Sequence, residues 1–223
     1  MARQKTKDRI LQVSLDLFNL YGEPNVTTID IANEMDISPG NLYYHYRNKD
    51  DIINELFARF EEEISSVLEV PFHTEITAVD GWMYVHMVFE AISHFRFLYR
   101  DLANILGRND KLLTRFNRVL DKKLNAAKAV FNMLRELGIM SLSDDELSAL
   151  AGNIVVTATY WINYEHIRNK TIRMSLNAAP TKEKPEENEN IAQGVYQVMT
   201  LISPWMEPET RGMLLEVAKM YIE

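Results

Sequence analysis

Two helix-start signals lie eleven residues apart near the N-terminus, and they constrain the fold more than any other feature of the sequence. Thr27 is followed three residues later by Asp30, which is the spacing of a capping box at the start of a helix. Ser38 directly precedes Pro39, so an N-cap residue stands before a proline at the first helical position, where a missing N–H costs nothing. The first of the two helices can therefore be only about two turns long. The sequence predicts two very short helices in succession, the second ending at Tyr46.

The rest of the chain predicts an all-α fold with about nine to ten helices in total. Apolar residues recur at helical spacing through most of the 223 residues, the eight glycines and seven prolines are few, and no segment shows convincing strand alternation. We expect a first helix over about 6–20 and a long helix from Asn48 to about 68. The segment 169–188 is rich in Asn, Lys, Glu and Pro and is expected to be a long mobile loop. Further helices are expected near 75–95, 97–107, 110–137, 143–167, 189–203 and 208–222.

Composition excludes several classes of protein. No run approaches the roughly 18 apolar residues of a membrane span, and no apolar h-region follows the first basic residues, so we expect a cytoplasmic protein without a membrane partner. The absence of cysteine excludes disulfides, a thiol nucleophile and thiolate zinc sites. The sequence also lacks a glycine-rich phosphate loop and a serine elbow of the G-x-S-x-G type. We therefore expect no enzyme, no catalytic residues and no cofactor.

The net charge of −8 is unevenly distributed along the chain. Residues 1–49 contain six Lys or Arg and six Asp or Glu, whereas residues 50–223 contain 18 and 26 respectively. Nucleic-acid binding normally requires a basic surface, because phosphates are neutralised by cations. Only the first part of the chain is therefore electrostatically suited to such a partner.

The two short helices and the turn between them, at residues 35–37, match the pattern of a helix-turn-helix, whose second helix enters the major groove of DNA. Ala32 lets the two helices cross closely. Asn41 can form paired hydrogen bonds with a base edge, and neighbouring tyrosines offer hydroxyls and aromatic edges. Tyr46 is predicted to be a core aromatic. The exposed face of the second helix is predicted to carry Gly40, Asn41, Tyr43, Tyr44 and His45.

The segment from Ile10 to Phe57, above all TTIDIANEMDISPGNLYYHYRNKDDII, resembles the DNA-binding domain of the TetR family of transcriptional regulators. The resemblance implies a helix-turn-helix DNA-binding domain over residues 1–48 and a helical effector-binding and dimerisation domain over 49–223. Two positions depart from the family pattern. Asp36 stands where the turn glycine is common, which is tolerable because aspartate visits the left-handed region more readily than most residues. Ile29 stands where some members have an arginine that contacts a base, so base readout would depend on Asn41, Tyr43 and DNA shape.

The resemblance also assigns individual positions to DNA. Four residues fall where family members contact phosphates: Thr28, Tyr44, His45 and Lys49. Four others fall where family members contact bases: Pro39, Gly40, Asn41 and Tyr43. The full set of predicted DNA-binding residues is Thr27, Thr28, Ser38, Pro39, Gly40, Asn41, Tyr43, Tyr44, His45 and Lys49.

The C-terminal part offers candidates for an effector pocket. Aromatic side chains with polar ends suit a ligand cavity inside a helical bundle, although such aromatic residues are more typical of a structural core. His86, Glu90 and His94 follow one another at four-residue steps, which could present metal ligands, but a metal site needs a ligand from another element and we predict none. The predicted pocket for an unidentified small apolar effector comprises Trp82, Tyr84, His86, Phe89, Glu90, Tyr99, Phe131, Trp161, Asn163 and Tyr164.

The predicted helix over 143–167 is apolar around most of its circumference, and such a helix is buried on more than one side. It could be the central helix of a monomer, or one face could contact a second subunit. In the TetR family two C-terminal helices of each protomer form a four-helix dimer interface, for which the segments 143–167 and 189–204 are our candidates. A dimer suits a palindrome, because two recognition helices about 34–36 Å apart contact its two half-sites.

Taken with these features, the resemblance implies a sequence-specific regulator of transcription in the cytoplasm, associated with the nucleoid. Its partner would be a palindromic double-stranded DNA operator, and its most typical form is a homodimeric repressor released by a ligand. The alternative is a regulator of the same fold controlled by protein partners or by spreading on DNA. A ligand-dependent loss of operator binding would separate the two hypotheses.

Overall fold

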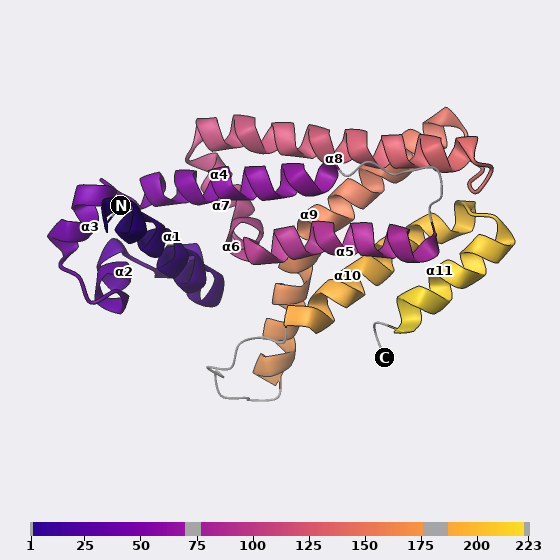
Figure 1. The fold of residues 1–223 in the computed structure, drawn as a ribbon. Coiled ribbons are helices and arrows are strands. Elements are labelled where there is room, and N and C mark those ends of the chain that lie inside the picture. Colours follow the sequence, from indigo (N-terminus) through magenta and orange to yellow (C-terminus); the bar gives the residue numbers. More distant parts are fainter. Residues whose placement is uncertain (1, 70–76, 176–186, 221–223) are drawn as a thin grey trace. The chain divides into compact units, whose positions relative to one another are not determined.

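The computed structural model of the chain describes residues 2–69, 77–175 and 187–220, and these form α-helices, 3₁₀ turns and connecting loops (Figure 1). The all-α prediction is confirmed. The only β-type pairing among the described residues is an isolated bridge between Met140 and Met206. No helix in these ranges is long and apolar enough to cross a membrane. The elements are α1 (Ala2–Tyr21), η1 (Glu23–Asn25), α2 (Thr28–Glu34), α3 (Pro39–His45), α4 (Lys49–Leu68), α5 (Ala78–His94), α6 (Arg96–Arg100), α7 (Leu102–Gly107), α8 (Asp110–Glu136), α9 (Asp144–Ser175), α10 (Glu187–Ile202), η2 (Ser203–Trp205) and α11 (Pro208–Met220).

Several predicted boundaries differ from the observed ones, beginning with the first helix, which starts at Ala2 and not at about residue 6. The single helix expected over 97–107 is two short helices, α6 and α7, interrupted at Asp101. The expected loop over 169–188 is wrong at both ends, because α9 continues to Ser175 and α10 begins at Glu187; the intervening residues 176–186 lie outside the described part of the chain. The sequence contains no glycine or proline between Gly152 and Pro180, so nothing in it terminates α9 near residue 168.

The chain divides into two compact units. The N-terminal unit consists of residues 1–63 and 95–115, and the C-terminal unit consists of residues 64–94 and 116–223. The N-terminal unit thus contains α6 and α7 in addition to the helix-turn-helix and most of α4. The boundary expected after residue 48 separates a DNA-binding part from an effector-binding and dimerisation part. It is a division by function, which differs from the division into compact units, and it stays a prediction.

The N-terminal unit is built around an aromatic core. Phe60 of α4 contacts Phe95 and Tyr99, each with ring centroids 5.7 Å apart, and Phe18 of α1 contacts Phe97 at 5.3 Å. All five rings are at most 1% exposed. Burial of such large rings is the dominant stabilising contribution available to a unit of this size. These contacts fix α6 on α1 and α4.

The C-terminal unit is a helical bundle in which α10 packs against α5 and α9, and α11 packs against α5 and α10 (Figure 1). The approach of α10 to its neighbours requires a glycine. A Cβ atom added to Gly194 would lie 2.5 Å from Cε1 of Phe89 and 2.7 Å from Cδ1 of Trp161, which is closer than carbon atoms can pack. Phe89 and Trp161 are therefore packing residues that cover α10.

Candidate functional site

The two short helices begin as the sequence predicts. The backbone N–H of Thr27 donates to Oδ2 of Asp30 at 2.8 Å, and the N–H of Asp30 donates to Oγ1 of Thr27 at 3.2 Å, which is a complete capping box. The hydrogen bonds from the Thr27 hydroxyl and backbone lower the pKa of Asp30. At the second helix, Oγ of Ser38 accepts the N–H of Asn41 at 3.2 Å, with Pro39 in the first turn. Both N-caps are confirmed.

The turn between α2 and α3 contains Asp36 in a left-handed conformation. Asp36 has φ of 54°, the left-handed conformation that most residues avoid, and it has the only positive φ of a non-glycine residue in the described part of the chain. The N–H of Ile37 then donates to the carbonyl of Ala32 at 3.0 Å. This confirms that Asp36 replaces glycine in the turn.

One face of α2 and α3 is buried and the other is open. Ile31, Ala32 and Leu42 are completely inaccessible, and Tyr46 is 3% exposed, as predicted for a core aromatic. The opposite face of α3, which we call the recognition face, comprises Gly40, Asn41, Tyr43, Tyr44 and the half-buried His45. Two tyrosines on it are unusually open, with exposed fractions of 47% for Tyr43 and 64% for Tyr44. The side chains selected from the sequence therefore share one accessible surface.

Gly40 is not required by packing within the chain. A Cβ atom added there would meet only Oγ of Ser38, at the ordinary contact distance of 3.9 Å. A glycine near the start of an exposed helix has no side chain to block the approach of another molecule, so that molecule can come close to the backbone. This position has the properties expected of a DNA contact.

A hydrogen bond links α2 to the recognition face, and the sequence analysis missed it. The hydroxyl oxygens of Thr28 and Tyr43 lie 2.9 Å apart, so one donates to the other. The bond restrains the Tyr43 ring and joins a residue expected at phosphate to one expected at bases. Ile29, next to Thr28, is 53% exposed and adds an apolar side chain beside this pair. No sequence signal indicates the bond, because the partners are 15 residues apart.

Lys49 is the only lysine or arginine among the predicted DNA-binding residues, and its ammonium is surrounded by oxygen atoms of the protein. Its Nζ lies 2.8 Å from Oε1 of Glu23 and donates to the carbonyl oxygens of Glu23 at 2.9 Å and Val26 at 3.0 Å. Glu23 is completely inaccessible, and its Oε1 also accepts from Nη2 of Arg108 at 2.7 Å. Burial of the Glu23 carboxyl opposes ionisation, but the hydrogen bonds and charges of Arg108 and Lys49 outweigh this effect and lower the pKa of Glu23 from its usual value. We call these three residues the Glu23 cluster.

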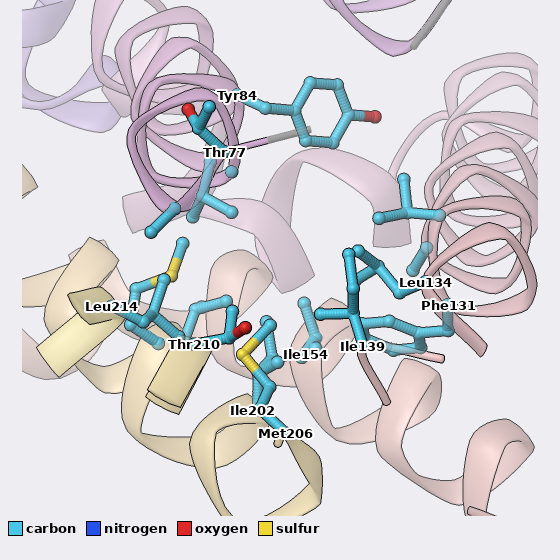
Figure 2. Close-up of a pocket in the computed structure, with 17 residues that line it drawn as sticks. Thr77, Tyr84, Phe131, Leu134, Ile139, Ile154, Ile202, Met206, Thr210 and Leu214 are labelled. Atoms are coloured by element: carbon cyan, nitrogen blue, oxygen red, sulfur yellow. The ribbon is translucent and has the colours of Figure 1, made fainter. Parts of the chain in front are cut away.

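The C-terminal unit contains an apolar cavity of about 100 Å³ (Figure 2). Its lining comes from α5, α8, α9, α10, α11 and the adjoining loops. In Figure 2, Thr77 and Tyr84 lie on one side of the cavity, and Ile202, Met206 and Thr210 lie on the other. The lining residues are Thr77, Ala78, Gly81, Tyr84, Val85, Ala127, Val130, Phe131, Leu134, Ile139, Ile154, Val198, Met199, Ile202, Met206, Thr210 and Leu214.

The polar groups of the cavity are hydroxyls. The hydroxyl of Thr77 donates to Oδ2 of Asp80 at 2.6 Å in the capping box of α5, so it is already used. Burial raises the pKa of Tyr84 to about 12, which keeps the phenol neutral at physiological pH. The cavity therefore presents neutral polar groups on an apolar wall and suits an uncharged molecule.

Only two of the ten predicted effector residues lie at the cavity. Tyr84 and Phe131 line the cavity, and the other eight do not. Tyr99 belongs to the aromatic core of the N-terminal unit. For the residues of α5 and α9 the reason is helical phase, since one face of each helix lines the cavity while the other predicted residues lie on other faces. The eight residues outside the lining are Trp82, His86, Phe89, Glu90, Tyr99, Trp161, Asn163 and Tyr164.

The histidine and glutamate of α5 are used in local contacts. Trp82 stacks on His86 with ring centroids 4.6 Å apart, and Nε2 of His86 lies 3.3 Å from Oε1 of Glu90. Tyr164, in contrast, is 49% exposed on α9. Most of the residues that line the cavity are aliphatic. Aliphatic side chains at helical spacing are typical of any helical core, so the sequence alone does not distinguish the lining of a cavity from ordinary core.

An exposed apolar stripe follows α9. Val156, Tyr160, Tyr164 and Ile167 lie three or four residues apart, which places them on one side of the helix, and each is between 49% and 59% exposed. The buried residues of α9, such as Ala151 and Ala158, lie at other positions around its circumference. An apolar stripe of this kind typically marks an interaction surface.

Two family models together match most of the chain. A family model described as "Bacterial transcriptional repressor" (TetR) matches residues 59–214, and one described as "Bacterial regulatory proteins, tetR family" matches residues 10–56. The chain is 25% identical over 140 residues to the HTH-type transcriptional regulator YttP of Bacillus subtilis, a match that covers 60% of this chain and 64% of that protein. The chain thus spans less than two thirds of the length of this curated relative.

Solved structures show the same fold over most of the chain. A TetR-family transcriptional regulator from Marinobacter aquaeolei VT8 is 34% identical, with a TM-score of 0.82, and the match covers 98% of this chain and 99% of that chain. A transcriptional regulator from Saccharomonospora viridis, solved in complex with choline, has a TM-score of 0.62 at 17% identity and covers 88% of this chain and 96% of that chain. The second likeness concerns the fold alone.

Proposed function

Because the chain belongs to the TetR family of DNA-binding bacterial transcriptional regulators, we propose that it acts as a homodimeric repressor on a palindromic operator and is released by a small molecule. The recognition face of α3 carries the proposal. Its polar and aromatic side chains are open to solvent, while the opposite face of the same helix is completely buried. A seven-residue helix capped at its start and held by Leu42 and Tyr46 presents these groups rigidly to a major groove.

Within this proposal the predicted residues have distinct roles. Asn41 forms paired hydrogen bonds with a base edge, and Tyr43, restrained by Thr28, contacts bases or the backbone beside it. Tyr44 and His45, whose rings meet edge to face at 5.2 Å, lie at phosphates. Thr27 and Ser38 cap the helix starts that approach the DNA backbone, and Pro39 and Gly40, in the first turn of α3, lie at bases.

The dimer is proposed to form through α9 and α10, within the segments 143–167 and 189–204. The exposed stripe of Val156, Tyr160, Tyr164 and Ile167 supports this, because water contact with four large apolar side chains on one helix face is unfavourable. In a dimer, the apolar stripe of one copy of the chain would pack against the same stripe of the second copy. Two copies would also supply the two recognition helices that a palindrome needs.

The apolar cavity is proposed as the effector site. An apolar cavity of about 150 Å³ can hold benzene, so a cavity of about 100 Å³ suits a small, neutral molecule such as a single ring or a short chain. The choline complex of the Saccharomonospora viridis regulator supports the idea that this fold accommodates a small molecule. Ligand binding would lower operator affinity only by favouring one arrangement of the two recognition helices over another.

The first test is selection of binding sites from fragmented genomic DNA with the purified protein, followed by sequencing. We expect a palindromic site, which the Asn41→Ala and Tyr43→Ala variants lose or relax. Tyr21→Ala is the matched control, because Tyr21 is a 58% exposed tyrosine at the end of α1 and outside the recognition face. Salt-sensitive binding without a preferred site would instead favour control by protein partners or by spreading on DNA.

The effector proposal is tested on the selected site with toluene, phenol and 1-hexanol as probes. We expect at least one probe to raise the melting temperature of the wild type and to weaken its operator binding. Ala127→Leu adds apolar volume to the cavity wall, so this variant should bind the operator but no longer respond to the probe. A response that is unchanged in Ala127→Leu would place the ligand elsewhere.

A further inference from the structure

We propose that Lys49 acts inside the protein as a positioning residue for the helix-turn-helix, through the buried carboxylate of Glu23 and together with Arg108, and does not contact a DNA phosphate. The inference rests on DNA binding by the family and is independent of effector control. It departs from the role that the resemblance gives to Lys49. Its basis is the geometry of the Glu23 cluster.

The hydrogens of the Lys49 ammonium are fully used. An ammonium group has three donors and no acceptor. Three oxygens surround Nζ, namely Oε1 of Glu23 at 2.8 Å, the carbonyl of Glu23 at 2.9 Å and the carbonyl of Val26 at 3.0 Å. No donor is left for a phosphate oxygen in this arrangement.

Turning Lys49 outwards would leave a charge unsatisfied in the interior. Glu23 is completely inaccessible, and its Oε2 has no hydrogen-bond partner among the described residues, so its charge depends on the two cations at Oε1. Loss of one partner from a buried ion pair is strongly destabilising, because the remaining charge can no longer reach water. A contact of one lysine with a solvated phosphate does not offset such a loss, because an ion pair that is exposed to solvent contributes little free energy.

The cluster joins three segments that are distant in sequence. Glu23 lies in η1, Lys49 is the first residue of α4, and Arg108 directly follows α7. The carbonyl of Val26 lies immediately before Thr27, the N-cap of α2. Arg108 also approaches Asp50 of α4, with 3.5 Å between Nε and Oδ1. The cluster therefore fixes the chain at the entry to α2 and at the exit from α3, and the recognition face lies between these two points.

Salt dependence of DNA binding distinguishes a positioning residue from a phosphate contact. Each phosphate contact contributes about 0.9 to the slope of log K against log salt concentration. We expect Lys49→Met to weaken binding of the selected palindrome at least about fivefold while changing that slope by less than about 0.3. Affinity is calculated from the active fraction, determined by stoichiometric titration at low temperature, so a partly unfolded sample does not imitate weak binding. A slope reduced by about 0.9 per protomer would overturn the proposal, as would an unchanged affinity.

Two further variants complete the test. Arg47→Gln removes an exposed cation two residues before Lys49 and measures how much the loss of an exposed cation in this segment changes the slope. Glu23→Gln should change DNA affinity in opposite directions for a phosphate-contacting Lys49 and for a positioning Lys49. A phosphate-contacting Lys49 would bind DNA equally well or more tightly once the competing carboxylate is gone, whereas a positioning Lys49 loses its anchor and binding weakens. If Lys49→Met does not fold, the charge-conserving double variant Glu23→Gln/Lys49→Met supplies the slope. Operator recognition itself is established first with the wild type, so its failure is seen as failure to select a site.

Discussion

Replacing Gly40 by alanine should change stability and DNA binding in opposite directions. Alanine is preferred over glycine in a helix by about 0.5–1 kcal/mol, and the added Cβ meets only Oγ of Ser38 at 3.9 Å, so no strain opposes the gain. A gain of this size raises the melting temperature of a chain of 223 residues by about 1–4 °C. The same methyl group projects from the recognition face and should hold the DNA away from the helix. Loss of one paired contact, such as that of Asn41, costs about 1–3 kcal/mol, or about 5- to 150-fold in affinity.

The assay combines thermal unfolding with operator binding on the selected palindrome. Gly212→Ala is the matched control, because Gly212 is an exposed glycine inside α11 whose added Cβ has nothing within 4 Å. Gly212→Ala should also raise the melting temperature, and it should leave the operator affinity unchanged. A Gly40→Ala protein that binds the operator as tightly as the wild type would refute the reasoning, because the start of α3 would then not approach DNA closely.

Three further predictions follow from single contacts. Thr28→Val and Tyr43→Phe should each weaken operator binding. In a double-mutant cycle, the loss of binding free energy in the double variant should be smaller than the sum of the two single losses by about 0.5–1.5 kcal/mol. Lys123 of α8 is 4% exposed, and burial lowers its pKa to about 7, so the unfolded chain binds more protons than the folded chain between pH 7 and 10.5. Stability should therefore rise by about 2–3 kcal/mol from pH 7 to 9.5 in urea unfolding, and Lys123→Met should abolish this rise; an equal rise in the variant would exclude Lys123 as the cause. Gly194→Ala should destabilise the protein by about 1–3 kcal/mol, because its Cβ would lie 2.5 Å from the ring of Phe89, and an unchanged denaturation midpoint would contradict that packing.

The features predicted correctly from the sequence are those that short segments determine. The N-caps at Thr27 and Ser38 and the left-handed Asp36 each depend on a few neighbouring residues, and the structure contains all three. Tyr46 was assigned to the core from helical spacing, which is also local. Local hydrogen bonds and backbone preferences are encoded within one turn of helix, so the position of the recognition face follows from them.

The features that the sequence analysis missed depend on distant contacts. The inward direction of Lys49 requires Glu23 to be buried, and that in turn requires Arg108, which lies 85 residues away from Glu23. The lining of the cavity depends on how five helices rotate against one another, and side chains such as Ile154 and Val198 are typical of any helical core. The helix end at Ser175 was missed for a different reason, since polar composition was taken to indicate a loop although no residue there stops a helix.

The distribution of charge on the N-terminal unit bears on how an acidic protein recognises DNA. The recognition helix contains neither lysine nor arginine, and the ammonium of Lys49 is directed into the protein. Exposed cations that remain available on this unit include Lys5, Arg9 and Arg47, which lie outside α3. Non-specific attraction should consequently be modest, because it depends on cations at phosphates. Discrimination among sequences then rests on the neutral groups of Asn41 and Tyr43, whose hydrogen bonds depend on correct geometry more than on charge. Correct geometry is what the Glu23 cluster is proposed to provide, so a small displacement of α3 should reduce specificity more than overall attraction.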